Sequence, residues 1–132
     1  MRMHDFSLPA LATLAIVALL FILAVNVGRQ RSRYKIDAPA TSGHPMLERA
    51  FRVQMNTLEN VVLILPAMWV FATFVNSALA ALLGMVWCLT RIWYAVSYMK
   101  DPKSRGSAFG ASVLVIVILF LGALWRIVSS LI

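Results

Sequence analysis

The sequence predicts an all-α integral membrane protein whose four transmembrane helices pack as one bundle. Hydrophobic residues make up 61% of its 132 residues, and the mean hydropathy is +0.84, which exceeds what a small soluble domain can bury. Uncharged runs long enough to cross a bilayer recur along the chain, separated by short polar segments. We therefore expect a single membrane domain over residues 1–132, with helices at about 8–29, 47–75, 78–100 and 107–128.

The first helix follows from an uncharged run between Leu8 and Val27, which is long enough to cross the hydrocarbon core. Pro9 suits the first turn of a helix, where a missing N–H is not needed. The basic segment 29–35 comes next, as is usual where a span reaches the membrane surface. Residues 37–45 are rich in proline, glycine and serine, so we expect a loop there.

The next two helices share an uncharged stretch at residues 61–90, which is too long for one ordinary span. Asn76-Ser77 is the natural break, and the short connection predicts an antiparallel hairpin. The third helix should end near Asp101, because a residue that precedes proline avoids the helical conformation. The fourth span ends at Trp125-Arg126, an aromatic and basic anchor of the kind found at membrane surfaces.

The net charge of +7 is concentrated at one end of the predicted bundle. Most of the lysines and arginines lie in segments 29–35 and 100–105, which four spans place on the same side of the membrane. By the positive-inside rule, loops 29–46 and 100–106 are cytoplasmic and both termini lie on the opposite side. Since these cations flank apolar spans and lack interleaved aromatic residues, they indicate contact with membrane lipid and no nucleic-acid partner.

The sequence lacks the usual signs of metal or disulfide chemistry. Cys88 is the only cysteine, which excludes an intramolecular disulfide. The two histidines are isolated, so we expect no metal site. Neither a glycine-rich phosphate loop nor a Ser-His-Asp set is recognisable.

Polar residues gather in the second helix, directly before its uncharged half. At about 100° per residue, five of them fall within one sector of about 100°: Arg49, Arg52, Asn56, Glu59 and Asn60. An ionisable side chain in a membrane span costs about 2.5–3.5 kcal/mol unless it is paired or faces a polar cavity. This cost indicates a site. Gln54 points away from the sector and would face a different neighbour, such as another subunit.

The third helix presents Arg91, Tyr94 and Tyr98 on one face, because residues three and four apart are neighbours on a helix. Arg91 and Glu59 lie at comparable depth, so we expect them to form a buried ion pair. An alternative is that these residues only hold two helices together, and that the tyrosines are simple surface-belt residues.

The polar side chains of both helices converge at the cytoplasmic end, together with a cation from the 100–106 loop. The set is Arg52, Asn56, Glu59, Tyr94, Tyr98 and Arg105. Such a cavity suits a small zwitterionic ligand with a net negative charge. Arginine binds carboxylates through two parallel hydrogen bonds, and glutamate accepts an ammonium group.

Three stretches carry a resemblance to a known family. Residues 48–59 (ERAFRVQMNTLE) resemble the E-R-x-x-R-x-Q-x-N-x-x-E stretch of the MAPEG family, membrane-associated proteins in eicosanoid and glutathione metabolism. Residues 91–98 (RIWYAVSY) resemble its R-x-x-Y-x-x-x-Y stretch, and residues 101–106 supply its basic loop. The resemblance covers essentially the whole chain, and the short loops are similar to those of bacterial members.

The resemblance implies a homotrimer that binds glutathione, as co-substrate, between adjacent subunits of the bacterial inner membrane. Arg105 would stabilise the glutathione thiolate, which attacks a lipophilic electrophile or a lipid hydroperoxide from the bilayer, as in a glutathione S-transferase with peroxidase activity. Gln54 would reach the ligand from the neighbouring subunit. The other implied glutathione contacts are Arg31, Arg52, Asn56, Glu59, Tyr94 and Tyr98, with Arg49, Asn60 and Arg91 in supporting positions.

Two other classes of function are compatible with the sequence. Asn60 stands where several members of the family have tyrosine, so the sequence does not identify the lipophilic substrate. A membrane protein with this fold could bind glutathione or lipid without catalysis. A small multidrug or ion transporter would place Glu59 on an alternating-access pathway, but Glu59 lies toward one end among arginines, which favours a fixed anion-tolerant site.

Overall fold

The computed structural model describes residues 3–132 and contains four long α-helices, with no β-strand in that range. A 3₁₀ turn precedes the first helix and another precedes the last. The elements are η1 (Met3–Phe6), α1 (Ser7–Tyr34), α2 (Pro45–Phe74), α3 (Ser77–Lys100), η2 (Pro102–Arg105) and α4 (Gly106–Leu131). By length and composition, all four long helices can cross a membrane. The predicted all-α fold with four spans is confirmed.

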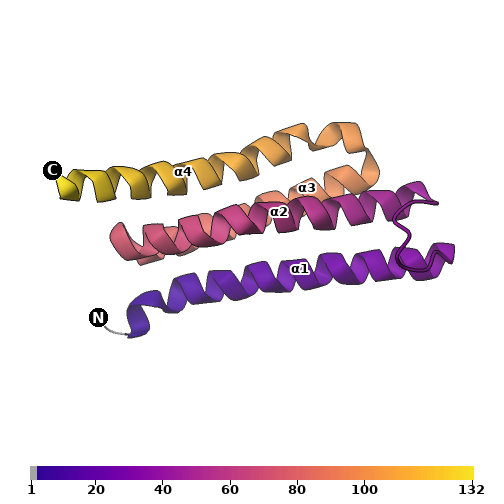
Figure 1. Ribbon diagram of the computed structural model, residues 1–132, viewed down its shortest axis with the longest axis horizontal. Coiled ribbons are helices and arrows are strands. Elements are labelled where there is room, and N and C mark those ends of the chain that lie inside the picture. Colours follow the sequence, from indigo (N-terminus) through magenta and orange to yellow (C-terminus); the bar gives the residue numbers. More distant parts are fainter. Residues whose placement is uncertain (1–2) are drawn as a thin grey trace.

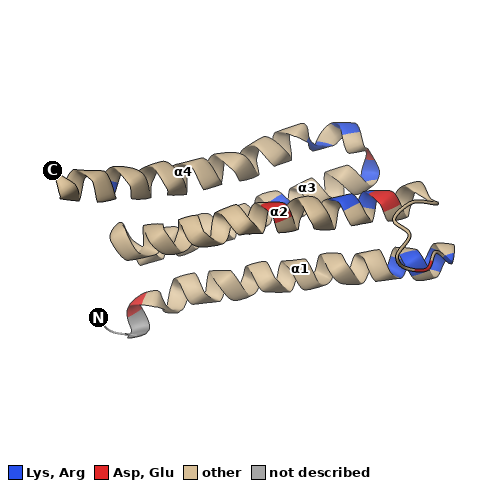
Figure 2. Cartoon of the chain, viewed as in Figure 1, with Lys and Arg blue, Asp and Glu red and all other residues tan. Residues whose placement is uncertain are grey.

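Helices α2 and α3 form the centre of the bundle. They pack against each other, and each also packs against both α1 and α4, which lie on opposite sides of the central pair (Figure 1). The two chain termini lie at one end, and the α1–α2 and α3–α4 connections lie at the other (Figure 1). Most Lys and Arg residues gather at this connection end (Figure 2), which we call the loop end.

Side-chain caps fix where three of the elements begin. The Nδ1 atom of His44 accepts a hydrogen bond from the Met46 N–H at 3.1 Å, and Pro45 occupies the first turn of α2. Asn76 caps α3 by accepting from the Leu79 N–H at 2.8 Å. Asp101 ends α3 in an extended conformation and caps η2 through the Lys103 N–H. The predicted break at Asn76 is therefore a helix cap.

Helix α1 continues further than the sequence suggested. The prediction ended it near residue 29, whereas α1 runs through the basic segment to Tyr34 and stops at Lys35, which has a left-handed conformation with φ of 55°. Arginines are good helix formers, and cations in a last turn interact favourably with the helix dipole. The basic segment therefore marks the membrane surface and not the end of the helix.

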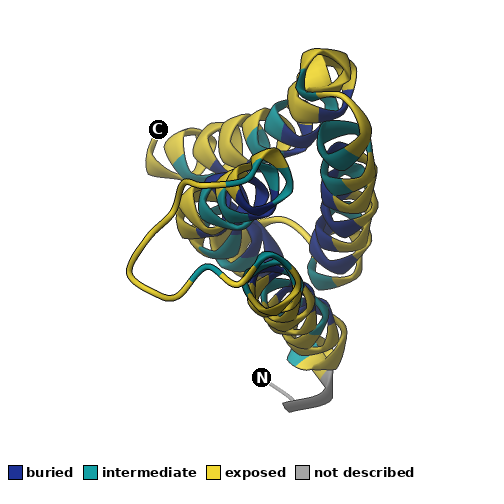
Figure 3. Ribbon diagram, turned by 90° about the vertical axis from the view of Figure 1, so that its right-hand side faces the viewer, coloured by how far each residue is buried: buried dark blue, intermediate teal, exposed yellow. Residues whose placement is uncertain are grey.

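Small residues let the central helices approach their neighbours closely. A Cβ atom on Gly84 of α3 would come within 2.5 Å of the Met68 sulfur, and one on Gly122 of α4 within 2.6 Å of the Phe71 ring. Buried residues face the inside of the bundle and exposed residues face outward (Figure 3), and many of the exposed residues are large and apolar. Such a surface suits contact with lipid or with other membrane helices.

Candidate functional site

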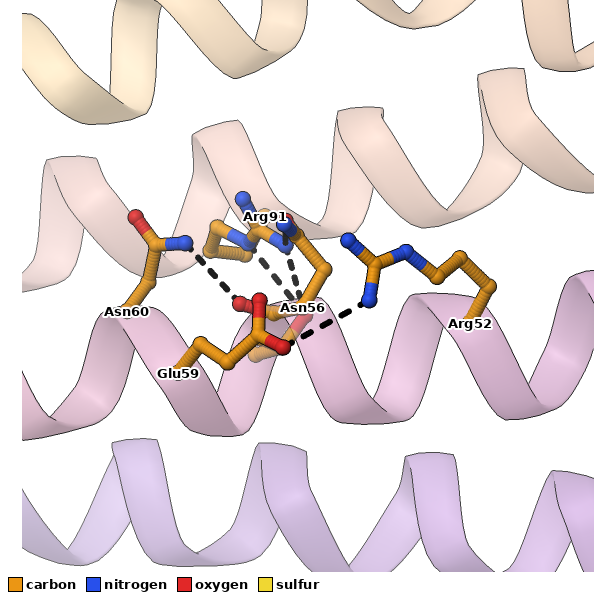
Figure 4. Close-up of polar contacts among 6 residues, drawn as sticks. Arg52, Asn56, Glu59, Asn60 and Arg91 are labelled. Carbon is orange, nitrogen blue, oxygen red and sulfur yellow. Dashed lines mark hydrogen bonds and ion pairs between the residues drawn. The ribbon is translucent and has the colours of Figure 1, made fainter.

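A buried arginine organises the polar interior of the bundle. Arg91 of α3 is 0% exposed. Its Nη2 donates to Asn56 Oδ1 at 2.8 Å and to Thr57 Oγ1 at 2.8 Å, both on α2, and its Nη1 donates to Ser112 Oγ of α4 at 3.3 Å. Figure 4 shows the guanidinium directed at α2 beside the Asn56 amide. One cation thus joins three helices through neutral oxygen acceptors.

The predicted ion pair between Arg91 and Glu59 is wrong. Glu59 Oε1 pairs with Arg52 Nη1 at 3.4 Å, and their side chains are 54% and 49% exposed. Arg52 precedes Glu59 by two helical turns, so both project from the same exposed edge of α2, whereas Arg91 approaches the buried edge through Asn56 and Thr57 (Figure 4). The polar sector of α2 therefore has a buried side and an open side.

Two tyrosines connect the buried arginine with the loop end. The Arg91 guanidinium lies 4.0 Å from the centre of the Tyr94 ring, a cation–π contact. The Tyr94 and Tyr98 rings are 5.6 Å apart, and the guanidinium of the exposed Arg105 lies 5.2 Å from the Tyr98 ring. The Tyr94 hydroxyl is buried without a hydrogen-bond partner in the described chain.

The hydrogen bonds also fix the orientation of Asn56. Since the carbonyl oxygen of its side chain accepts from Arg91, its amide nitrogen is the atom left to face a ligand, as a donor. Asn60 does not take part in this way, because its Nδ2 donates to the backbone carbonyl of Asn56 at 2.9 Å. Arg91 is thus a positioning residue for Asn56, and Asn60 supports the backbone behind it.

The remaining predicted residues have other contacts. Arg31 Nη1 donates to the Ala40 carbonyl at 2.6 Å and so ties the 36–40 loop to α1. No hydrogen bond joins Gln54 to the cluster within the part of the chain that the structure describes. Successive contacts link Asn56, Arg91, Tyr94, Tyr98 and Arg105. The Arg52–Glu59 pair projects from the same stretch of α2, but within the described residues no hydrogen bond or ion pair joins it to those five. These seven residues together form the polar cluster around α2, α3 and η2.

A comparison of the sequence with protein families agrees with the motifs in this cluster. The sequence model of the MAPEG family matches residues 9–125. The chain belongs to the MAPEG family. With four helices able to cross a membrane, this MAPEG chain is a multi-pass integral membrane protein.

Three known proteins are similar to this chain over most of its length. An uncharacterized protein of Synechocystis sp. is 42% identical over 93% of this chain and 90% of its own length. Microsomal glutathione S-transferase 2 of Homo sapiens is 34% identical over 76% of this chain and 69% of its own. Leukotriene C4 synthase of Mus musculus is 32% identical over 95% of this chain and 78% of its own.

The structure adds two residues that the MAPEG motifs did not indicate. Thr57 and Ser112 are both 0% exposed and supply hydroxyl oxygens to Arg91. Hydroxyls are common in membrane helices, so neither residue is conspicuous in the sequence. A usable signal was Arg91 itself, because a guanidinium in a membrane span is costly unless nearby groups accept its hydrogen bonds.

Arg49 has a structural role in this MAPEG chain. Its Nη1 donates to the carbonyls of Met99 and Lys100 at 3.0 and 3.2 Å, which satisfies the C-terminal end of α3. We expect Arg49→Ala to lower the free energy of unfolding by about 1–3 kcal/mol, measured by denaturant unfolding in detergent. The matched control is Arg33→Ala at the same end. Equal losses in both variants would contradict this role.

Proposed function

We propose that this chain is a membrane-bound glutathione-dependent transferase that activates the glutathione thiol as a thiolate. The observation that carries the proposal is the cluster of the open Arg52–Glu59 pair on α2 and the contact series from Asn56 through Arg91, Tyr94 and Tyr98 to Arg105. It supplies cationic, anionic and hydroxyl groups within one end of a membrane bundle. Relatives named as glutathione transferases share the fold family.

The open edge of α2 suits the charges of glutathione, which has two carboxylates and one ammonium group. The Arg52–Glu59 pair is long, at 3.4 Å, and about half exposed. An exposed pair of this kind is worth only about 0–1 kcal/mol. A zwitterionic ligand can therefore separate the pair, with a carboxylate on Arg52 and the ammonium on Glu59. Asn56 donates from its amide nitrogen beside them.

Arg105, at the other end of the cluster, would activate the glutathione thiol. A free thiol has a pKa of about 8.5, so only a small fraction is ionised at neutral pH. The Arg105 guanidinium next to the sulfur favours the charged thiolate and lowers the pKa of the bound thiol. The thiolate attacks an electrophilic carbon to give a thioether, and the bond from that carbon to its leaving group, or to the oxygen of an epoxide, breaks and leaves its electron pair on the departing atom. With a hydroperoxide, two glutathione molecules become a disulfide, and the products are an alcohol and water.

We further propose that adjacent subunits of a homotrimer complete the site. The half-exposed Arg52–Glu59 pair lies within a helix that crosses the membrane, and contact of such a pair with lipid is costly. A neighbouring subunit that carries Gln54 would cover it. The hydrophobic substrate then enters from the bilayer. By the positive-inside rule, the loop end and the glutathione entrance lie on the cytoplasmic side of a bacterial inner membrane.

Mixing two defective subunits tests the shared site. In the proposed site, one subunit supplies Asn56 and the neighbouring subunit supplies Gln54. We expect Gln54→Ala and Asn56→Ala each to weaken glutathione binding, because each removes one hydrogen-bond partner of the ligand. When the two variants are co-expressed in equal amounts, random trimers should regain about one quarter of the intact sites, as measured by glutathione titration. A mixture that binds no better than the average of the two single variants would argue for sites within one subunit.

A calorimetric titration of the purified protein with glutathione tests the function itself. We expect saturable binding together with ultraviolet absorbance of a thiolate, and loss of the absorbance in Arg105→Ala. Binding without a thiolate signal would indicate a non-catalytic glutathione-binding protein. An absence of binding would overturn the proposal.

A further inference from the structure

The seam between α1 and α3 contains an open groove near the loop end that the glutathione site does not use. Its volume is about 570 Å³ and its floor is apolar, with Phe21, Val25 and Val96 among the lining residues. Two cations, Arg29 of α1 and Lys100 of α3, line the same groove. Both are exposed. The groove is therefore amphipathic along its length.

These two cations are not neutralised by the protein. Within residues 5–132, no hydrogen bond or ion pair engages the Arg29 guanidinium or the Lys100 ammonium group. The adjacent carboxylate of Asp101 accepts from the Lys103 N–H and caps η2. A negative group that enters between Arg29 and Lys100 would thus meet two available positive charges.

The same pair of helices provides an internal comparison. Nearer the termini, α1 and α3 enclose a second groove of about 660 Å³, lined by Leu8, Leu14 and Leu82 among others. No charged residue lines that groove. Since the same two helices form both grooves, their packing alone does not explain the cations, which line only the groove at the loop end.

The dimensions fit one lipid leaflet. Phe21 and Arg29 are separated by about 12 Å along a helix, and half of a typical hydrocarbon core is about 15 Å thick. A lipid whose acyl chain lies over Phe21 and Val96 would have its headgroup at the level of Arg29 and Lys100. Basic pockets between spans at the cytoplasmic side are known to hold anionic lipid headgroups.

We propose that this groove binds an anionic glycerophospholipid of the loop-side leaflet, with its phosphate between Arg29 and Lys100 and one acyl chain along the α1–α3 seam. The site is separate from the glutathione cluster, which lies around α2, the tyrosine face of α3 and η2. The proposal does not depend on the glutathione chemistry.

Native mass spectrometry of the purified full chain tests this site, with phosphatidylglycerol and phosphatidylcholine of equal chain length offered at equal concentration. We expect the wild type to retain phosphatidylglycerol about tenfold more than phosphatidylcholine. The double variant Arg29→Gln/Lys100→Gln should lose this preference. The matched control Arg33→Gln/Lys103→Gln removes the same charge from the same end, outside the groove, and should keep it. Equal loss in both double variants would overturn the proposal, because the attraction would then be non-specific.

A second pair of variants tests the apolar part of the groove without changing charge. Val96 and Leu82 are exposed at 50% and 59%, so tryptophan at either position should not disturb the core. We expect Val96→Trp to release the bound phosphatidylglycerol, whereas Leu82→Trp in the other groove should retain it. Full retention in Val96→Trp would overturn the assignment. A changed oligomeric mass in that variant without bound lipid would assign the groove to a neighbouring subunit instead.

Glutathione titration of the same variants separates the two proposals. Neither Arg29 nor Lys100 belongs to the glutathione cluster, so loss of lipid should leave glutathione affinity unchanged. A wild type that retains phosphatidylglycerol but binds no glutathione would count against the proposed function alone.

Discussion

Arg105→Ala is expected to lower kcat/KM for conjugation of glutathione to a lipophilic electrophile by about 100- to 1,000-fold. Arg105 lies at the end of the cluster, over the Tyr98 ring. In the proposed function its charge would stabilise the thiolate and contribute less to the binding of glutathione. Glutathione affinity should therefore change by less than about fivefold, the usual effect of one exposed cation. Steady-state kinetics and calorimetric titration measure the two quantities separately.

The pH dependence of the rate provides a more specific test of this role. A guanidinium next to the sulfur lowers the pKa of the bound thiol, so its removal raises that pKa by about one to three pH units. The rise of the rate with pH should accordingly move to higher pH in Arg105→Ala, and the defect should shrink above about pH 9. Lys103→Ala, which removes a nearby exposed cation, serves as the control. A defect that is constant at every pH would contradict thiolate stabilisation.

Arg91→Met is expected to reduce stability and glutathione affinity together. Ser112 keeps its hydrogen bond to the Phe109 carbonyl, but Asn56 Oδ1 and Thr57 Oγ1 lose the buried donor they share. Two unsatisfied buried groups, offset in part by removal of a buried charge, predict a loss of about 2–4 kcal/mol in the free energy of unfolding. Since Asn56 is no longer oriented, the KM for glutathione should rise at least about tenfold.

Thr57→Val separates the positioning role of Arg91 from its contribution to stability. This variant removes one acceptor of Arg91 but leaves the bond from Arg91 to Asn56 in place. It should therefore destabilise the protein while changing the KM for glutathione by less than about threefold. Arg91→Lys keeps the charge and should recover part of the stability. An unchanged KM in Arg91→Met, in a preparation that remains folded, would show that Arg91 has only a structural role.

The membrane spans could be predicted because the apolar composition of a segment indicates whether it crosses a membrane. Which side chains pair with each other depends on how the helices pack. The uncharged runs and the Asn76 and Asp101 breaks predicted the helices of the bundle, since a membrane requires long apolar segments. Helix spacing likewise placed Tyr94 and Tyr98 on one face with Arg91. Helix spacing also placed the polar residues of α2 in one sector, and the family motifs contain the same residues.

The ion pair was predicted wrongly because two arginines, Arg52 and Arg91, were possible partners for Glu59. The depth of Arg91 and Glu59 along their helices was comparable, but rotation about each axis decides contact, and Arg52 lies on the same edge of α2 as Glu59. Sequence depth does not specify that rotation. The contacts of Arg49 with the end of α3 and of Arg31 with the 36–40 loop also required the tertiary arrangement.

The order in which the helices are synthesised determines when the hydrogen bonds of Arg91 can form, because its acceptors lie on α2 and α4. The outer helices α1 and α4 are synthesised first and last, and each is apolar enough to enter the bilayer alone. Arg91 of α3 can meet Asn56 and Thr57 as soon as the α2–α3 hairpin forms, whereas its contact with Ser112 must wait for the last span. A nascent or truncated chain without α4 would expose a partly satisfied guanidinium to lipid. The hydrogen bond between Arg91 and Ser112 therefore forms only after α4 has entered the membrane.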